Sequence, residues 1–169
     1  MKKLISFLLC LCLLLLCSAC IPEEDNTEGS LRFFYLRSEL TYGNADSVIA
    51  AEEYTPAAEP PDLDALLEQY LSGPAREDLR SPFPVGCAVA AYQFSDGVLT
   101  LRMNDAYSSL SGVSLTQACS CLAMTVFALT DAHTASIQAE NGSPIMDLTR
   151  DSLILQDLPP EIPTTEENT

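Results

Sequence analysis

An apolar run from residue 4 to residue 17 opens the chain and limits where a folded domain can begin. The run follows Lys2 and Lys3, contains Ser6 as its one polar residue, and is followed by the small pair Ser18-Ala19. A short positive region, an apolar stretch and a small-residue end are typical of an export signal peptide. A stable membrane span needs about 20 apolar residues, so a spanning helix is the less favoured interpretation. We therefore expect residues 1–19 to be a signal peptide and folding to begin after them.

The segment Leu16-Cys17-Ser18-Ala19-Cys20 resembles the lipobox of bacterial lipoproteins, with Cys17 standing where leucine is commonest. The resemblance implies that the Cys20 thiol takes a diacylglycerol group before cleavage and that the new N-terminus can be acylated as well. Two acyl groups give stable anchoring where one does not. The prediction is lipidation at Cys20 and a location on the outer face of the bacterial cytoplasmic membrane. Ordinary signal-peptidase cleavage and an uncleaved anchor are the alternatives.

The chain after residue 19 is strongly acidic and contains no lysine. Six arginines stand against 24 acidic residues there, which gives a formal charge of −18. Binding to phosphate needs clustered Lys and Arg, so nucleic acid is not expected as a partner. We interpret the acidity as a solvated surface that keeps the protein soluble, with a specific cation or cationic partner as the alternative.

Composition divides the remaining chain into three parts. Residues 20–30 hold the lipidated cysteine and an acidic, turn-rich tether. Residues 31–157 carry the periodic apolar patterns of a single domain, and residues 158–169 predict a disordered acidic tail. A domain of about 120 residues can bury a hydrophobic core without disulfides or a metal ion.

Strand signals open the domain. Residues 31–36 include Phe33 and Tyr35 and are apolar on both faces, which predicts a central strand. Residues 47–54 predict a second strand, with the turn between them at Gly43-Asn44.

Further strand signals lie in the second half of the domain. Residues 87–94 and 98–103 flank Asp96-Gly97, and an Asp-Gly pair between two strand-like runs is a strong hairpin signal. Residues 134–140, followed by an Asn-Gly turn, and the short stretch 153–155 predict two more strands.

Two stretches have helical periodicity. The first follows the potential cap Asp62, and Gly73-Pro74 ends it. Its apolar stripe consists of Leu63, Leu66, Leu67, Tyr70 and Leu71. The second begins at Ser114, whose spacing to Gln117 fits a capping box, and ends near residue 130. Strands interleaved with two helices predict an α/β sandwich, with a mixed β-sheet and both helices packed on one face.

Few side chains of the chain fall into patterns typical of catalysis or metal binding. Three cysteines remain after Cys20, namely Cys87, Cys119 and Cys121; an odd number does not imply a disulfide framework, and we expect buried free thiols. Cys119 and Cys121 lie two residues apart on a helix and so point about 200° away from each other, which disfavours a shared metal ion. The single histidine, His133, lies where a helix C-terminus favours a cation, and Asp105 is expected in a turn. No catalytic residue, metal site or cofactor is predicted.

Four segments together resemble the GerMN domain of sporulation and spore germination proteins. They are the opening strand 32–36, the helix end Tyr70-Leu71-Ser72-Gly73-Pro74, the stretch from Leu79 to Gly86 with its Phe-Pro-x-Gly motif, and the hairpin leading to the second helix and the Ile137 strand. The resemblance covers residues 31 to 156. It implies a membrane-attached, extracytoplasmic domain associated with sporulation or germination, without known catalysis or cofactor.

The expected function is therefore that of a non-catalytic interaction module. Its partners would be the membrane, through Cys20, and other envelope proteins, while the oligomeric state is left open. The alternatives are an enzyme or small-ligand binder acting on the cell wall, and a purely structural envelope lipoprotein. A pocket with converging polar groups would favour the enzyme or ligand binder.

Overall fold

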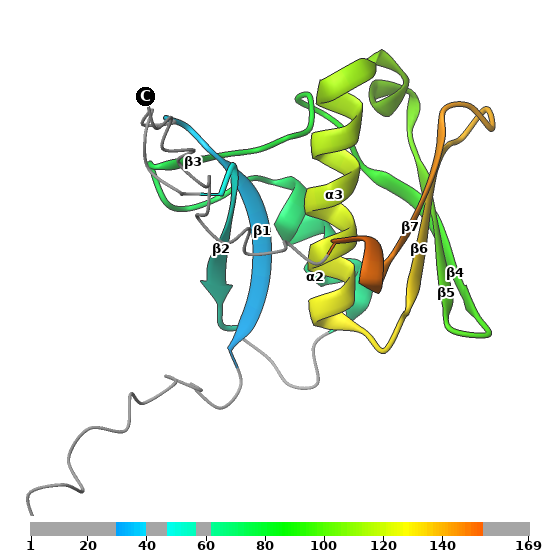
Figure 1. Cartoon of the computed structure of the whole chain (residues 1–169), viewed down its shortest axis with the longest axis horizontal. Coiled ribbons are helices and arrows are strands. Elements are labelled where there is room, and N and C mark those ends of the chain that lie inside the picture. Colours follow the sequence, from blue (N-terminus) through cyan, green and yellow to red (C-terminus); the bar gives the residue numbers. More distant parts are fainter. Residues whose placement is uncertain (1–29, 40–46, 57–61, 154–169) are drawn as a thin grey trace, which may run out of the picture. The chain divides into compact units, whose positions relative to one another are not determined.

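In the computed structural model, the strand-forming stretches pair into two sheets, described over residues 30–39, 47–56 and 62–153 (Figure 1). The signal peptide, Cys20 and most of its tether, the Gly43-Asn44 turn and the tail 158–169 lie outside the described residues. Those predictions therefore stay predictions.

Sheet A is antiparallel and has strand β1 (Leu31–Arg37) in its middle. Its edges are β2 (Ile49–Tyr54) and the two-residue strand β3 (Leu79–Arg80). Phe33 and Tyr35 are buried on one face of β1, as the alternation of side chains along a strand requires. The prediction that this stretch forms a central strand is confirmed.

Sheet B has the order β4-β5-β6-β7. Its strands are β4 (Val89–Ser95), β5 (Val98–Met103), β6 (Thr134–Ala139) and β7 (Ile145–Thr149). Strands β4 and β5 form the predicted hairpin, in which Asp96 and Gly97 both take positive φ, 52° and 75°. Strands β5 and β6 pair in parallel because the second helix carries the chain back between them, so the sheet is mixed.

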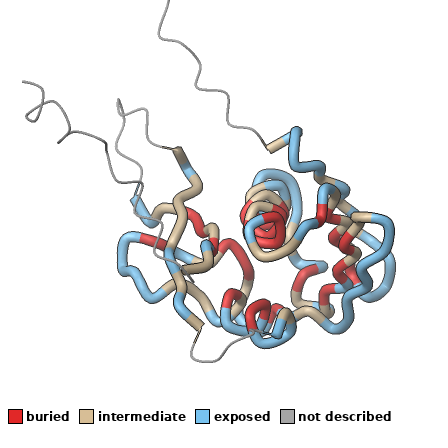
Figure 2. Tube along the Cα trace, turned by 90° about the horizontal axis from the view of Figure 1, so that it is seen from below, coloured by how far each residue is buried: buried red, intermediate tan, exposed pale blue. Residues whose placement is uncertain are grey.

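Helix α3 (Gly112–Leu129) lies between the two sheets, and helix α2 (Leu63–Leu71) packs on the inner face of sheet A (Figure 1). Buried positions concentrate on α3 and on the segments that surround it (Figure 2). The predicted α/β sandwich is confirmed, with its strands divided between two sheets. Helix α3 is long and apolar enough to pass as a membrane span by composition, but here it is the core helix of the domain.

Two local details differ from the prediction. Helix α3 begins at Gly112, with Ser111 as its N-cap, so Ser114 is the third residue of the helix and not its cap. The Ser111 N–H donates to the Ser114 hydroxyl (3.4 Å), as in a capping box. The last described strand of sheet B is residues 145–149, which was not predicted, and of the strand predicted at 153–155 only Leu153 lies within the described residues. The turn at Gly142 sends the chain straight back along β6, and Leu153 lies in the short 3-10 helix η2 (Arg150–Leu153).

A polar clamp joins β1 to both helices. The Phe34 N–H donates to the Thr125 hydroxyl of α3 (2.9 Å), and the Phe34 carbonyl accepts from the Tyr70 hydroxyl of α2 (3.0 Å). The Tyr35 hydroxyl in turn donates to the Tyr70 carbonyl (2.9 Å). Because β3 pairs with β1 only at Leu36 and Arg37, these side chains satisfy a backbone edge that none of the described strands covers.

Replacing Thr125 by valine should remove the hydrogen bond from the Phe34 N–H with little change in the volume of the side chain. The partly buried Phe34 N–H would then lose its partner, so the free energy of unfolding should fall by about 1 kcal/mol or more. Urea denaturation of wild type, Thr125→Val and Thr125→Ser measures the effect. Serine keeps the hydroxyl, and its variant should stay closer to wild type than the valine variant; a valine variant as stable as wild type would show that the clamp is not needed.

Candidate functional site

A cleft of about 590 Å³ lies between α2 and the segment that leads into β4. One wall comes from residues 64–72 of the helix region and the other from residues 81–89. Leu67, Phe83 and Cys87 give it an apolar floor, and the exposed carboxylates of Asp64 and Glu68 line its helix side. Among the described residues that line it there is no Lys, Arg or His. The cleft thus combines an apolar floor with uncompensated negative charge.

The wall formed by residues 81–89 is held in shape by local hydrogen bonds. The Phe83 N–H donates to the Ser81 hydroxyl (3.2 Å), and the Cys87 N–H donates to the Pro84 carbonyl (3.1 Å) across a turn. Gly86 takes φ +81°, a conformation that favours glycine. Val85, at the tip of this turn, is fully exposed (102%). The turn therefore presents an apolar side chain to solvent at the mouth of the cleft.

Asn104 ties this wall to the end of β5. Its side-chain amide donates to the Gly86 carbonyl (2.8 Å) and accepts from the Ala88 N–H (3.2 Å). The Asn104 N–H also donates to the Ala88 carbonyl (3.0 Å). Behind the wall, the Phe83 ring packs edge-on against Tyr70 at 6.3 Å. The turn is thereby fixed both to sheet B and to the core.

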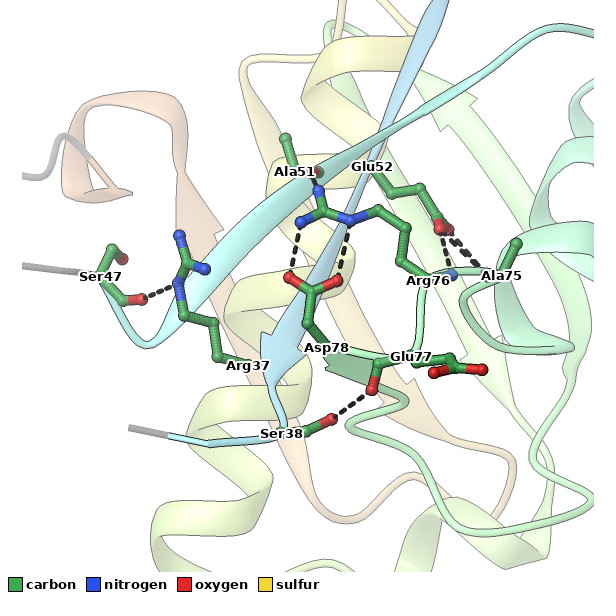
Figure 3. A network of polar contacts seen from close by, with 9 residues as sticks. All are labelled: Arg37, Ser38, Ser47, Ala51, Glu52, Ala75, Arg76, Glu77 and Asp78. Carbon is green, nitrogen blue, oxygen red and sulfur yellow. Dashed lines mark hydrogen bonds and ion pairs between the residues drawn. The ribbon is translucent and has the colours of Figure 1, made fainter. Parts of the chain in front are cut away.

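The opposite wall is anchored to sheet A by a polar network after α2 (Figure 3). The Glu52 carboxylate accepts from the N–H groups of Ala75 (3.1 Å) and Arg76 (2.8 Å). The Arg76 guanidinium donates twice to Asp78 (3.0 and 2.6 Å) and once to the Ala51 carbonyl (3.2 Å). These hydrogen bonds hold the pKa of the Asp78 carboxyl below its usual value. The network fixes the exit of the helix against β2.

Strand β4 extends the site as an open edge. Among the described strands it is hydrogen-bonded to β5 alone, and six of its seven residues are exposed. Tyr92 and Phe94 pair with Leu101 and Leu99, so they lie on the sheet face that is turned toward the helices. The pKa of the Tyr92 phenol is raised, first by partial burial and then by the nearby carboxylates of Asp64 and Asp62, which sets the start of α2 beside β4.

The cysteines predicted as buried thiols are buried and free. The Cys119 thiol lies 3.2 Å from the Tyr107 hydroxyl. Residues two apart on a helix point about 200° away from each other, and the described residues contain no group of His, Cys, Asp and Glu suited to a metal. Cys121 is buried, as expected, because α3 is covered on both sides.

His133 and Asp105 do not form a polar site. His133 is exposed, its ring lies against Gly97, and its Nδ1 is 3.1 Å from the Thr134 hydroxyl. The cation at the end of α3 is Arg150, whose guanidinium donates to the carbonyls of Phe127, Thr130 and Ala132. Asp105 begins the 3-10 helix η1 (Asp105–Ser109), in line with a turn role.

The cleft itself was not predicted. Its two walls were recognised in the sequence as a helix end and a Phe-Pro-x-Gly turn, both interpreted as devices for folding. One signal in the sequence could have indicated a binding surface. Pro82, Pro84 and Gly86 lie in one short turn, and the apolar Val85 between them is exposed.

Burial raises the pKa of the Cys87 thiol to about 11 and that of Cys121 to about 12, from 9.0. Below pH 9 these thiols are mostly protonated in both the folded and the unfolded protein. Above pH 9 the thiols of the unfolded protein lose their protons first, because their pKa is lower. We therefore expect the free energy of unfolding to fall as pH rises from 9 toward 11, by about 1 kcal/mol per pH unit or more. Urea denaturation under reducing conditions at pH 8 and pH 10.5 measures this.

Alkylation offers an independent check on the same thiols. At pH 8, iodoacetamide should modify peptides containing Cys87 and Cys119 only after denaturation, as mass spectrometry of tryptic peptides can show. Rapid modification of the native protein at both positions would contradict their burial.

Comparison with known proteins gives limited similarity. No family model and no curated protein matches the chain. Among solved structures, the chain is similar to the tandem GerMN domains of the sporulation protein GerM from Bacillus subtilis, with a TM-score of 0.48 and 17% sequence identity. The match covers 68% of this chain and 39% of the GerM chain, so this chain matches less than half the length of that protein.

Proposed function

We propose that the chain is a bacterial lipoprotein, anchored through Cys20 to the outer face of the cytoplasmic membrane, whose domain binds other envelope proteins without catalysing a reaction. The observation that carries the proposal is the acid-lined cleft beside the exposed strand β4. Contiguous exposed apolar side chains mark interaction surfaces; Val85 is exposed at the mouth of the cleft, and Tyr92 and Phe94 are exposed along β4.

The proposal includes a role in sporulation or germination. Its support is the resemblance of the sequence to GerMN domains, and two of the four segments that carry it contribute to the walls of the cleft. Leu71 and Ser72 belong to the helix-end segment, while Ser81, Phe83 and Gly86 belong to the Phe-Pro-x-Gly segment. Part of this surface is thus built by residues that give the resemblance.

A small-ligand binder is the second candidate. The volume of the cleft, about 590 Å³, falls in the range of pockets that hold small molecules. Both carboxylates on its wall are exposed, however, and the described lining offers no histidine or cation to work with them. The interaction role therefore remains the better supported of the two.

Replacing Cys20 by alanine tests the anchor. In a bacterial host, the wild-type chain should sediment with membranes and carry a diacylglycerol adduct on residue 20, while Cys20→Ala should lack the adduct and the processing that depends on it. Intact-mass measurement and membrane fractionation report the two outcomes. Cys17→Ala is the matched control, because it removes a cysteine of the same segment and should leave lipidation intact.

Two results would contradict the anchor. Equal solubility of wild type and Cys20→Ala would show that no lipid holds the chain. Membrane binding of both with an uncleaved N-terminus would show that the apolar run itself is the anchor.

A further inference from the structure

The edge strands of the two sheets differ in how they are protected. An exposed strand edge can pair with another chain, and natural proteins commonly block it with a charged residue. Edge strand β2 carries Glu52 and Glu53, β3 carries Arg80, and β7 carries Asp147. Strand β4 has the sequence Val-Ala-Ala-Tyr-Gln-Phe-Ser and carries no charge. Among the edge strands of the described structure, β4 is therefore the one left open to pairing.

The cleft lies at the beginning of this same strand. Val89, the first residue of β4, lines the cleft together with Cys87 and Ala88 just before it. Across from them stand the carboxylates of Asp64 and Glu68. A chain lying along β4 would thus continue over the cleft and meet both its apolar floor and its acidic wall.

We propose that β4 and the cleft together bind an extended, lysine- or arginine-bearing segment of a second protein, which adds to sheet B as a further strand. This inference rests on one part of the proposed function, namely that the domain is an interaction module. Backbone hydrogen bonds to β4 supply affinity, as in other cases of strand addition. Tyr92 and Phe94 contact alternate apolar side chains of the segment, while Asp64 and Glu68 pair with its basic residues.

Charge selects this occupant over a second copy of the chain. The mature chain has a formal charge of −18 and no lysine, so two copies brought edge to edge repel one another. Two β4 strands would also bring the carboxylates of both clefts into the same assembly, and the described lining of the cleft holds no cation to offset them. A basic segment gains from the same field that opposes dimerisation.

The experiment uses the full chain in neutral detergent and fluorescein-labelled peptides of about nine residues, long enough to span a strand. One peptide alternates lysine and valine, a second alternates glutamate and valine, and a third repeats the first with N-methyl groups on alternate backbone nitrogens. Fluorescence anisotropy should show binding of the first and none of the second. N-methylation should weaken binding by about tenfold or more, because it removes strand hydrogen bonds while keeping every side chain.

Two protein variants locate the peptide. Asp64→Asn combined with Glu68→Gln should weaken binding of the lysine peptide by about five- to tenfold. Asp131→Asn combined with Asp151→Asn removes the same charge from exposed positions that do not line the cleft, and should change binding by less than about twofold. All four side chains are exposed, so both variants should keep the circular dichroism spectrum of wild type.

Any of three results would overturn the inference: no binding of the lysine peptide, equal binding of its N-methylated form, or equal weakening by both pairs of substitutions. A dimer of the full chain that the lysine peptide does not displace would assign β4 to a second copy instead. None of these results touches the lipid anchor, whose test reads residue 20 directly, so failure of the inference and failure of the proposed function remain distinct.

Discussion

The peptide group of Phe34 is the point on which the arrangement of the domain depends. Strand β3 is two residues long, so one side of β1 would otherwise expose backbone groups inside the core. Thr125 from α3 and Tyr70 from α2 satisfy the N–H and the carbonyl of this one residue. An unpaired buried backbone group costs about as much as a lost hydrogen bond, so the two helices cannot shift independently of β1.

This clamp also explains where the cleft comes from. Tyr70 holds the last turn of α2 against β1, and its ring contacts Phe83 on the opposite wall. The polar groups around Glu52 and Asn104 then fix the outer parts of both walls. A cleft whose walls are tied to two sheets through separate hydrogen bonds is held open by the fold itself, and its shape does not depend on an occupant.

Local patterns in the sequence predicted the elements, while contacts between distant segments decided how they assemble. The stripe of α2 and the Asp96-Gly97 turn have signals within a few residues, and both are found as predicted. Division into two sheets has no such signal, because it depends on which strands meet across α3. Strand β3 is too short to leave a pattern, and the alternation of Met146 and Leu148 in β7 is a weaker signal than the continuous apolar stretch at 153–155. The cleft was missed for the same reason, since it requires residues 64–72 and 81–89 to face each other.

The acidity of the chain favours solubility in general, and beside β4 it also favours the binding of a basic partner. Charges spread over a surface raise the rate at which an oppositely charged partner arrives, and they are screened beyond about 8 Å at physiological salt. These charges do not fix the orientation of the partner. An open strand edge fixes it, because strand pairing sets both direction and register. A side chain that enters the cleft then sets where along the edge the pairing begins. Net charge, edge and cleft thus act at successive stages of one binding event, and the absence of charge on β4 itself leaves its backbone free for the last of them.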